Sequence, residues 1–189
     1  GVDMIAKGNG VAQPVIRGLS MTNILMLNNG IKLENFQFSE NHPYLIDEFG
    51  VDRVEVIKGP ASLLYGSDAV GGVINVIKEK PAIDGTIEGD YNAQYHSNTE
   101  GLVTNLGIKS RSGDFFYGLR AGIRSHQDYK DGNMDRVPNT RYNENSFKAN
   151  LGLNRSFGVF RLFYDYNRPK LGMCVGDAIK DVTENGRKN

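Results

Sequence analysis

The sequence of 189 residues lacks tryptophan, has a single cysteine and carries no formal net charge. Cys174 has no partner for an internal disulfide, so we expect it to be a small buried or loop side chain. With 22 basic and 22 acidic residues, the chain shows neither the basic excess typical of nucleic-acid binding nor an acidic tail. It has no apolar run long enough for a transmembrane helix and no signal-peptide pattern at its start. A transmembrane β-strand needs only about ten alternating residues, so these absences remain compatible with a membrane protein built from strands.

Residues 1–80 have the pattern of a compact α+β unit. Short apolar runs broken by Gly, Asn and Pro predict strands of a small mixed sheet at Val15–Ile16, Ile24–Leu27, Val54–Ile57 and Val73–Ile77. Asn29-Gly30 predicts a tight hairpin, because both central positions of that turn take positive φ. Leu45–Phe49 and Ala61–Leu64 predict short helices of one or two turns.

From residue 86 onward, apolar and polar residues alternate with the period of a β-strand. In residues 86–95 the alternation is unbroken, with Ile87, Tyr91 and Tyr95 on one face and only polar side chains on the other. Four further segments repeat the pattern, and their polar faces include Asn105, Lys109, Arg120, Arg124, Lys148, Asn150, Arg161 and Asp165. We therefore expect about five antiparallel strands, each with one apolar and one polar face.

The connections between these strands alternate in length. Ser112-Gly113-Asp114 and Ser156-Phe157-Gly158 predict minimal turns, whereas 126–145 and the stretch from Arg168 onward predict long polar loops. Short turns alternating with long loops are typical of an outer-membrane barrel, with turns in the periplasm and loops outside. A soluble structural or adhesive β-sandwich gives the same strand alternation and stays open as an alternative from another class.

Three segments of the first half resemble the plug domain of TonB-dependent outer-membrane receptors. They are Pro14–Leu19, Ile24–Leu33 with Asn29 in place of the usual Asp, and above all the long segment Val51–Ile77. The resemblance implies an α+β plug domain at 1–80 with its N-terminal part missing. It also implies that 84–189 forms the first five or so strands of a truncated transmembrane β-barrel of about 22 strands.

The resemblance also assigns roles to individual residues. It implies that Arg17 and Lys58 lock the plug to acidic residues of the barrel wall. Lys58 stands where the family usually has Arg, and it lacks the planar fork that binds a carboxylate through two hydrogen bonds. The residues that make up the plug signature are Gly18, Arg53, Glu55, Gly59, Pro60, Tyr65, Gly66, Gly71, Gly72 and Asn75. Its glycines suit sharp turns and close approaches of the backbone.

By the same resemblance, the parent protein is a receptor in the bacterial outer membrane that imports a scarce ligand without catalysing a reaction. An iron chelate, either a siderophore or haem, is the expected cargo, with cobalamin or an oligosaccharide as alternatives. The TonB energy-coupling complex and outer-membrane lipid are the expected partners. Gly1-Val2-Asp3 resembles the turn that follows the energy-coupling segment, which is therefore expected to be missing.

Candidate ligand-binding residues lie in the loop at 34–42. Phe36, Gln37, Phe38 and His42 combine aromatic and polar groups, as small-molecule sites do. His96 and His126 are expected at the extracellular ends of strands. We expect no catalytic site, cofactor or metal site, because the glycine-rich stretch 66–72 has no phosphate-loop context and 131–135 lacks the later ligands of a calcium loop.

Overall fold

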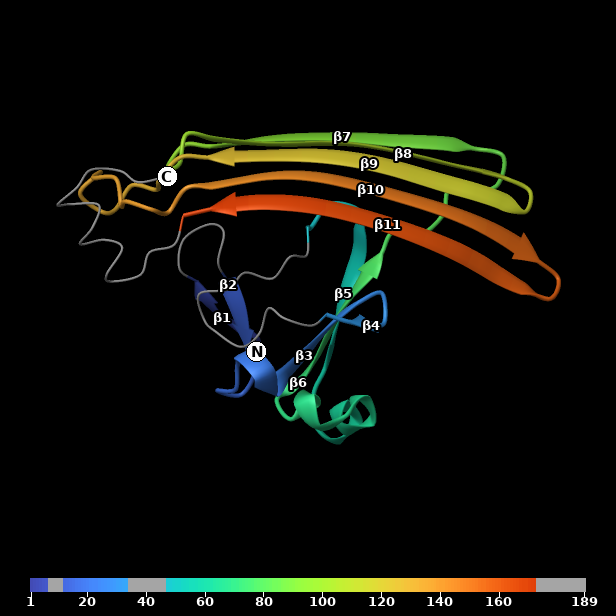
Figure 1. The fold of residues 1–189 in the computed structure, drawn as a ribbon, viewed down its shortest axis with the longest axis horizontal. Coiled ribbons are helices and arrows are strands. Elements are labelled where there is room, and N and C mark those ends of the chain that lie inside the picture. The colour runs from blue at the N-terminus through green and yellow to red at the C-terminus, as the bar shows by residue number, and fades with distance from the viewer. Residues whose placement is uncertain (7–11, 34–46, 173–189) are drawn as a thin grey trace.

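The computed structural model describes residues 1–6, 12–33 and 47–172, which form three sheets (Figure 1). β1 (Asp3–Ala6) and β2 (Ala12–Val15) form an antiparallel pair. A four-stranded sheet in the order β4-β3-β6-β5, the small sheet, lies beneath a five-stranded sheet in the order β11-β10-β9-β8-β7, the long sheet. The long strands in Figure 1 form one broad layer, and the short segments gather on one side of it.

The small sheet is mixed, as the sequence predicts. It contains β3 (Ile24–Asn28), β4 (Ile31–Lys32), β5 (Val51–Ile57) and β6 (Gly72–Lys78), and β3 and β6 run parallel. Both faces of β3 are buried, because Ile24 and Met26 pack in one apolar cluster while Leu25 and Leu27 pack in another. A strand covered on both faces needs apolar residues at every position, which explains the continuous run Ile24–Leu27.

The hairpin at Asn29-Gly30 is confirmed. Asn29 and Gly30 have φ values of 53° and 83°, the left-handed geometry that a two-residue turn between twisted strands requires. The Oδ1 atom of Asn75 in β6 accepts a hydrogen bond from the Gly30 amide at 3.0 Å. A residue of the predicted plug signature therefore holds the tip of this hairpin.

The expected short helices are not confirmed as α-helices. The described residues contain only 3-10 turns, at η1 (Met21–Asn23), η2 (Pro60–Tyr65) and η3 (Ser67–Ala69). Gly59 and Gly66 flank η2 with φ values of 82° and 106°, and this left-handed geometry ends the helical segment on both sides. Of the range predicted at 45–49, residues 45 and 46 lie outside the described part, and 47–49 are not helical. No helix of the described ranges is long and apolar enough to cross a membrane.

The long sheet is a continuous antiparallel meander. Its strands are β7 (Ile87–His96), β8 (Gly101–Ser112), β9 (Phe115–His126), β10 (Tyr142–Arg155) and β11 (Gly158–Leu171). The two predicted minimal turns join β8 to β9 and β10 to β11. β10 begins at Tyr142, within the loop predicted at 126–145. β11 ends at Leu171, beyond the predicted start of a loop at Arg168. Polar residues continue these strands because the backbone ladder extends to Tyr142 opposite His126 and to Leu171 opposite Tyr142.

The predicted faces of the long strands are confirmed. Apolar side chains on the face turned away from the small sheet are exposed, among them Tyr91 at 69%, Leu106 at 61% and Leu162 at 67%. The opposite face, which we call the inner face, carries buried polar residues including Asn105, Arg120, Glu144 and Ser146. The inner face is therefore a polar surface covered by the preceding half of the chain.

Candidate functional site at the charged seam

The first half of the chain contacts the inner face of the long sheet through two short segments, 47–50 and 78–80, and through Asn28 of β3. We call this contact the charged seam. Asp47, Glu48, Phe49, Lys78, Glu79 and Lys80 form its near side, and Lys109, Arg120, Arg124, Lys148 and Asp165 form its far side.

The register of the long sheet aligns the charged groups of the far side. Asp90, Gly107, Arg120, Lys148 and Asp165 are successive partners across β7, β8, β9, β10 and β11. Directly opposed residues of neighbouring strands place their side chains on the same face. One row across the sheet therefore presents an acidic residue, a glycine, two basic residues and a second acidic residue to the segments beneath it.

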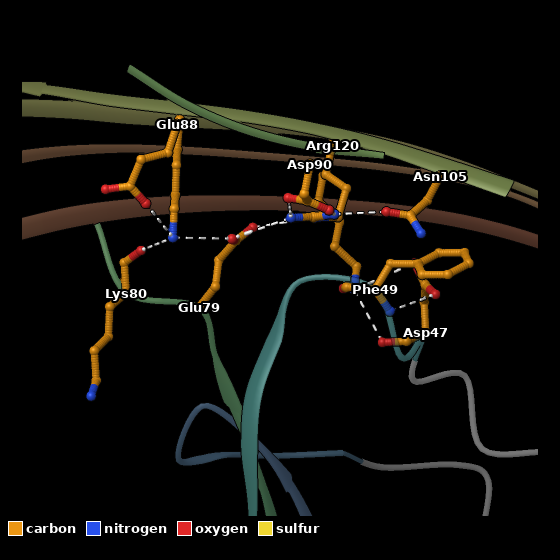
Figure 2. A network of polar contacts seen from close by, with 10 residues as sticks. Asp47, Phe49, Glu79, Lys80, Glu88, Asp90, Asn105 and Arg120 are labelled. Carbon is orange, nitrogen blue, oxygen red and sulfur yellow. Dashed lines mark hydrogen bonds and ion pairs between the residues drawn. The ribbon is translucent and has the colours of Figure 1, made fainter. Parts of the chain in front are cut away.

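Arg120 is the centre of this row. Its Nη1 and Nη2 atoms donate to the two carboxylate oxygens of Asp90 at 2.7 and 2.6 Å. Its Nε and Nη2 atoms also donate to Glu79 at 3.2 and 3.3 Å, and Nη1 donates to Asn105 at 2.7 Å (Figure 2). These five hydrogen bonds match the five N–H donors of a guanidinium. Arg120 therefore joins three strands of the long sheet to the segment that leaves β6.

The position between Arg120 and Asp90 in this row is occupied by a glycine. A Cβ atom placed on Gly107 would lie 2.5 Å from Arg120 Cζ, closer than any packing contact allows. The guanidinium thus lies directly over the β8 backbone and reaches a strand that is not its neighbour. Gly107 is required for this bridge because any side chain would occupy the space of the guanidinium.

Segment 47–49 is held by two cations of neighbouring strands. Arg124 Nη2 lies 3.0 Å from Asp47 Oδ1 and 3.1 Å from Glu48 Oε1, and its guanidinium carbon lies 4.7 Å from the centre of the Phe49 ring. Lys148 Nζ lies 3.4 Å from Asp47 Oδ2 and donates to the Phe49 carbonyl. The Asp47 side chain is 2% exposed. A buried carboxylate of this kind is stable only because both cations and the Phe49 amide contact it.

The same segment also packs through shape. A Cβ atom on Gly122 would lie 2.7 Å from Phe49 Cδ2, so the Phe49 ring rests against bare backbone of β9. Gly50, next in the chain, has a φ of 70°, which turns the backbone into β5. The segment is therefore fixed by an aromatic ring, a glycine turn and ion pairs together.

A second set of contacts joins the end of β6 to β11 and β8. Lys78 Nζ pairs with Asp165, and Asn28 of β3 also donates to this carboxylate at 3.4 Å. Lys109 Nζ donates to the Lys80 carbonyl at 3.1 Å and lies 3.5 Å from both Glu79 and Glu88. A small cavity of about 40 Å³ lies between Lys78, Lys148 and Asp165, and a larger open groove of about 420 Å³ borders Glu79, Asp90 and Arg120.

This arrangement can hold two layers together without an apolar core between them. Ion pairs and hydrogen bonds to charged groups have directional geometry, and water can replace each of them when the layers separate. In most of these ion pairs the first half supplies the acidic residue and the long sheet supplies the basic one. In the Lys78–Asp165 pair the charges are the other way round. The seam is therefore suited to reversible attachment rather than to chemical catalysis.

A smaller polar cluster ties two connections of the long sheet together at the end opposite the short turns. Lys130 Nζ and Arg136 Nη2 lie 2.9 and 2.7 Å from the two carboxylate oxygens of Glu100. The hydrogen bond from Lys130 and the charge of Arg136 hold the pKa of Glu100 below its usual value. Asn98 and Lys130 also exchange two hydrogen bonds, at 2.8 and 3.0 Å. The loop at 127–141 is thereby attached to the β7–β8 connection.

The two predicted locking residues lie elsewhere. Arg17 is exposed with a φ of 53° and forms, with Gly18, the tip of a tight turn between Ile16 and Leu19. Lys58 donates to the Gly1 carbonyl at 3.0 Å. Within the described ranges, no hydrogen bond or ion pair joins either residue to the long sheet. The prediction that they bind acidic residues of the barrel wall remains a prediction.

The signature glycines have clear backbone roles. Gly59, Gly66 and Gly72 have φ values of 82°, 106° and 145°, which other residues rarely adopt. A Cβ atom on Gly72 would lie 2.8 Å from the Ile57 carbonyl oxygen, and one on Gly71 would lie 3.0 Å from that of Asn23. The glycine pair lets β6 enter the small sheet between two strands at close range.

The remaining signature residues lie on the surface of the small sheet and its turns. Arg53 of β5 pairs with Glu55 at 2.7 Å and Asp52 at 2.8 Å in exposed ion pairs, and the hydrogen bond to Glu55, followed by that to Asp52, raises the pKa of Arg53. Pro60 begins η2 and Tyr65 ends it, with Tyr65 46% exposed. None of these three side chains takes part in the charged seam in the described structure.

The candidate ligand residues Phe36, Gln37, Phe38 and His42 lie outside the described residues, as does Cys174. His96 and His126 end β7 and β9, the strand ends predicted for them. The seam residues were missing from the predicted site, although the sequence carried a signal. Alternation places Arg120, Arg124, Lys148 and Asp165 on the polar faces of their strands, but it does not show which residues of the first half approach them.

Comparison with known proteins agrees with this architecture. A family model described as the TonB-dependent receptor plug domain matches residues 1–73. The vitamin B12 transporter BtuB of Photobacterium profundum is 36% identical over 78 residues, which cover 41% of this chain and 13% of that protein. BtuB of Vibrio vulnificus strain CMCP6 is 46% identical over 68 residues, which cover 35% of this chain and 11% of that protein.

Residues 1–73 belong to the plug-domain family of TonB-dependent receptors. The chain is accordingly a protein of the bacterial outer membrane. The small sheet, β1, β2 and the 3-10 turns coincide with the plug match at 1–73, apart from the last residues of β6. The antiparallel strands of the long sheet resemble those of a TonB-dependent receptor barrel.

Solved structures show the same fold beyond the plug. The copper transporter OprC has a TM-score of 0.78 and 22% identity, and the match covers 92% of this chain and 27% of OprC. The pyoverdine receptor FpvA of Pseudomonas aeruginosa has a TM-score of 0.70 and 21% identity, with coverage of 88% and 23%. The chain thus spans a small part of each relative's length, and at this identity the structural likeness concerns the fold alone.

Proposed function

We propose that this chain is part of an active transporter that binds an iron chelate, either a siderophore or haem, at the cell surface and imports it across the outer membrane. The observation that carries the proposal is the charged seam. The plug-matching half lies against the polar inner face of the strands and is attached through ion pairs at 47–50 and 78–80. A plug attached in this way blocks a pore yet can be displaced without breaking an apolar core.

These contacts support a proposed division of the chain. Residues 1–80 form the plug, and 84–189 contribute the first strands of the barrel wall. Glu79 and Lys80, at the end of the plug, bind Arg120 and Lys109 of the wall. The short connection to β7 is thus anchored where the chain passes from one part to the other, and movement of the plug is expected to leave this corner in place.

Energy for release would come from the TonB complex of the inner membrane, acting through a periplasmic coupling segment as the family resemblance implies. In this proposal Arg17 and Lys58 contact acidic residues of the wall beyond the five strands described. Phe36, Gln37, Phe38 and His42 contact the ligand from the plug's outer loops. No covalent chemistry is required of any of these residues, and the receptor is proposed not to be an enzyme.

Cobalamin is the second candidate cargo, because the vitamin B12 transporters named above are 36% and 46% identical to the plug-containing half. Sequence identity within the plug does not specify one cargo. The signature residues form turns, close glycine contacts and strand pairs in the described structure, and these roles are the same for any ligand. An oligosaccharide is the third candidate cargo for a transporter of this kind. A structural or adhesive role is the alternative outside it.

Uptake measurements discriminate among these proposals. A strain lacking the parent receptor is supplied with labelled ferric siderophores, haem or cobalamin, and accumulation is compared with the complemented strain. We expect loss of uptake of one iron chelate and raised expression of the receptor under iron limitation. Loss of cobalamin uptake with unchanged expression would support the second candidate instead. Unaltered uptake of every ligand, together with loss of cell attachment, would support the adhesive role.

A further inference from the structure

Two histidines far apart in the sequence lie side by side on the inner face of the long sheet. His96 is the last residue of β7 and His126 the last residue of β9, with β8 between these strands. Their ring centres are 5.1 Å apart, and the ring planes are inclined by 64°. Neighbouring strands are about 4.8 Å apart, so side chains on β7 and β9 start roughly 10 Å from each other. The two rings have therefore converged across a whole strand.

A glycine between them makes this approach possible. Gly101 of β8 is the strand partner of His96, and a Cβ atom on Gly101 would lie 2.2 Å from His126 Nδ1. The His126 ring thus lies over the bare backbone of β8. The same geometry operates at Gly107, where Arg120 crosses β8 to bind Asp90. At both positions, a β9 side chain passes over a glycine of β8 and contacts a β7 side chain.

The orientation of His126 is fixed by its neighbours. Its Nδ1 atom is 2.9 Å from the hydroxyl oxygen of Thr99, which is 3% exposed, and its ring stacks on Tyr142 with centres 6.5 Å apart. A hydrogen bond at Nδ1 leaves Nε2 as the nitrogen able to bind a metal ion. Metal-binding histidines commonly have this second contact, because it sets both tautomer and ring direction. His96 is exposed and free to turn its ring toward the same point.

We propose that His96 and His126 form a two-imidazole site for a transition-metal ion of the Cu²⁺, Zn²⁺ or Ni²⁺ class at the rim of the barrel. An ion bound about 2.0–2.1 Å from each imidazole nitrogen places the two ring centres roughly 5 Å apart, and the observed spacing is 5.1 Å. Imidazole nitrogens suit these ions well. In the described ranges no cluster of three or more His, Cys, Asp or Glu groups has metal-binding spacing, so the site is open and its remaining positions are taken by water or a ligand's donor atoms.

The site lies beside the connections that hold Thr99 and Glu100, at the end of the strands opposite the short turns. It is separate from the charged seam, which engages other rows of the sheet. The inference goes beyond the proposed function and does not rest on it, because metal binding by the two imidazoles is measured without transport.

The test titrates the parent receptor, purified in detergent without a histidine tag, with Cu²⁺. Electron paramagnetic resonance reports nitrogen ligands, and calorimetry reports affinity. We expect His96→Ala and His126→Ala each to weaken binding at one site at least tenfold and to remove one nitrogen from its spectrum. Gly101→Ala is expected to do the same while keeping both histidines. Gly89→Ala, where an added Cβ atom would lie 3.4 Å from the Gly107 carbonyl oxygen, serves as the matched control for Gly101→Ala. His42→Ala, which removes the third histidine of the chain, shows whether the signal comes from that residue instead.

Each outcome decides the proposal. His96 is exposed, so His96→Ala is expected to keep the heat-resistant folded barrel, and retained folding together with lost Cu²⁺ binding supports the site. Wild-type spectra and affinity in both His96→Ala and His126→Ala would overturn it and leave ring packing as the only role of the pair. Loss of the same signal in His42→Ala alone would also overturn it. Uptake of the cargo by these variants is scored separately, so failure of this site and of the proposed function are distinguishable.

Discussion

Arg120 crosses Gly107 to reach Asp90, and a Cβ atom at Gly107 would lie 2.5 Å from Arg120 Cζ. We therefore expect Gly107→Ala to displace the guanidinium and break its hydrogen bonds to Asp90 and Glu79. Hydrogen exchange in the parent receptor should show lost protection at Glu79, whose amide donates to the Gly50 carbonyl at 3.0 Å. Gly89→Ala is the matched control, because a Cβ atom there would be at an ordinary 3.4 Å from the Gly107 carbonyl. Equal protection in the two variants would contradict the role given to Gly107.

Arg120→Lys tests the geometry of the fork while keeping the charge. An ammonium offers three donors in place of the five that Arg120 uses. With hydrogen bonds to charged groups contributing about 1.5–3 kcal/mol each, we expect the attachment of the plug to weaken by about 3 kcal/mol. Ion conductance of the receptor in planar bilayers should rise as the plug loosens. Arg53→Lys, which alters only two exposed ion pairs on β5, should leave conductance unchanged.

Asp47 and Lys148 should be energetically coupled. Asp47→Asn leaves two cations facing a neutral group, so it should destabilise the receptor. Lys148→Met should lower the free energy of unfolding less in the Asp47→Asn variant than in the wild type. We expect a coupling free energy of about 1–3 kcal/mol in denaturant unfolding. The exposed pair Arg155–Asp114 provides the reference cycle, with an expected coupling of about 0.2–1 kcal/mol. Equal couplings would mean that burial of Asp47 adds nothing.

Asn75 should control the Asn29-Gly30 hairpin. Asn75→Ala removes the acceptor of the Gly30 amide and is expected to cost about 1 kcal/mol. The Gly30 amide should then exchange several-fold faster with solvent in the intact receptor. Asn75→Asp, which keeps an oxygen at this position, should retain more of the protection, and an unchanged exchange rate in Asn75→Ala would show that the turn is stable alone.

The Glu100 cluster should depend on pH. Its folded-state pKa lies below the usual 4.5, with the Lys130 hydrogen bond as the largest cause. The carboxylate contacts therefore stabilise the loop fully above the unfolded-state pKa and are lost as the pH falls through the lower folded-state pKa. A spin label at Asn133 should become more mobile only in this acidic range. In Glu100→Gln the label should be mobile already at neutral pH, and a persisting acid transition there would assign it to another group.

Local pattern predicted most of the strands and little of the contact between them. Residues 24–27, the Asn29-Gly30 turn and the alternation at 86–95 each satisfy a backbone requirement within a few residues, so the sequence was sufficient for them. The helical turns expected at 61–64 are 3-10 rather than α-helical, and Gly59 and Gly66 bound them on either side. The ends of β10 and β11 were missed because polar residues there continue the ladder by pairing rather than by apolar burial.

What the sequence alone determined about this protein is therefore its plug signature, the membership that follows from it and the two faces of the long strands. The tertiary structure decided which charges meet. Arg120 and Glu79 are 41 residues apart, and Lys148 and Phe49 are 99 apart, so neither pairing leaves a periodic trace along the chain. Strand register sets the row of charges, and glycines at 101 and 107 open the space above β8. Both depend on pairing across strands, which a one-dimensional pattern does not contain.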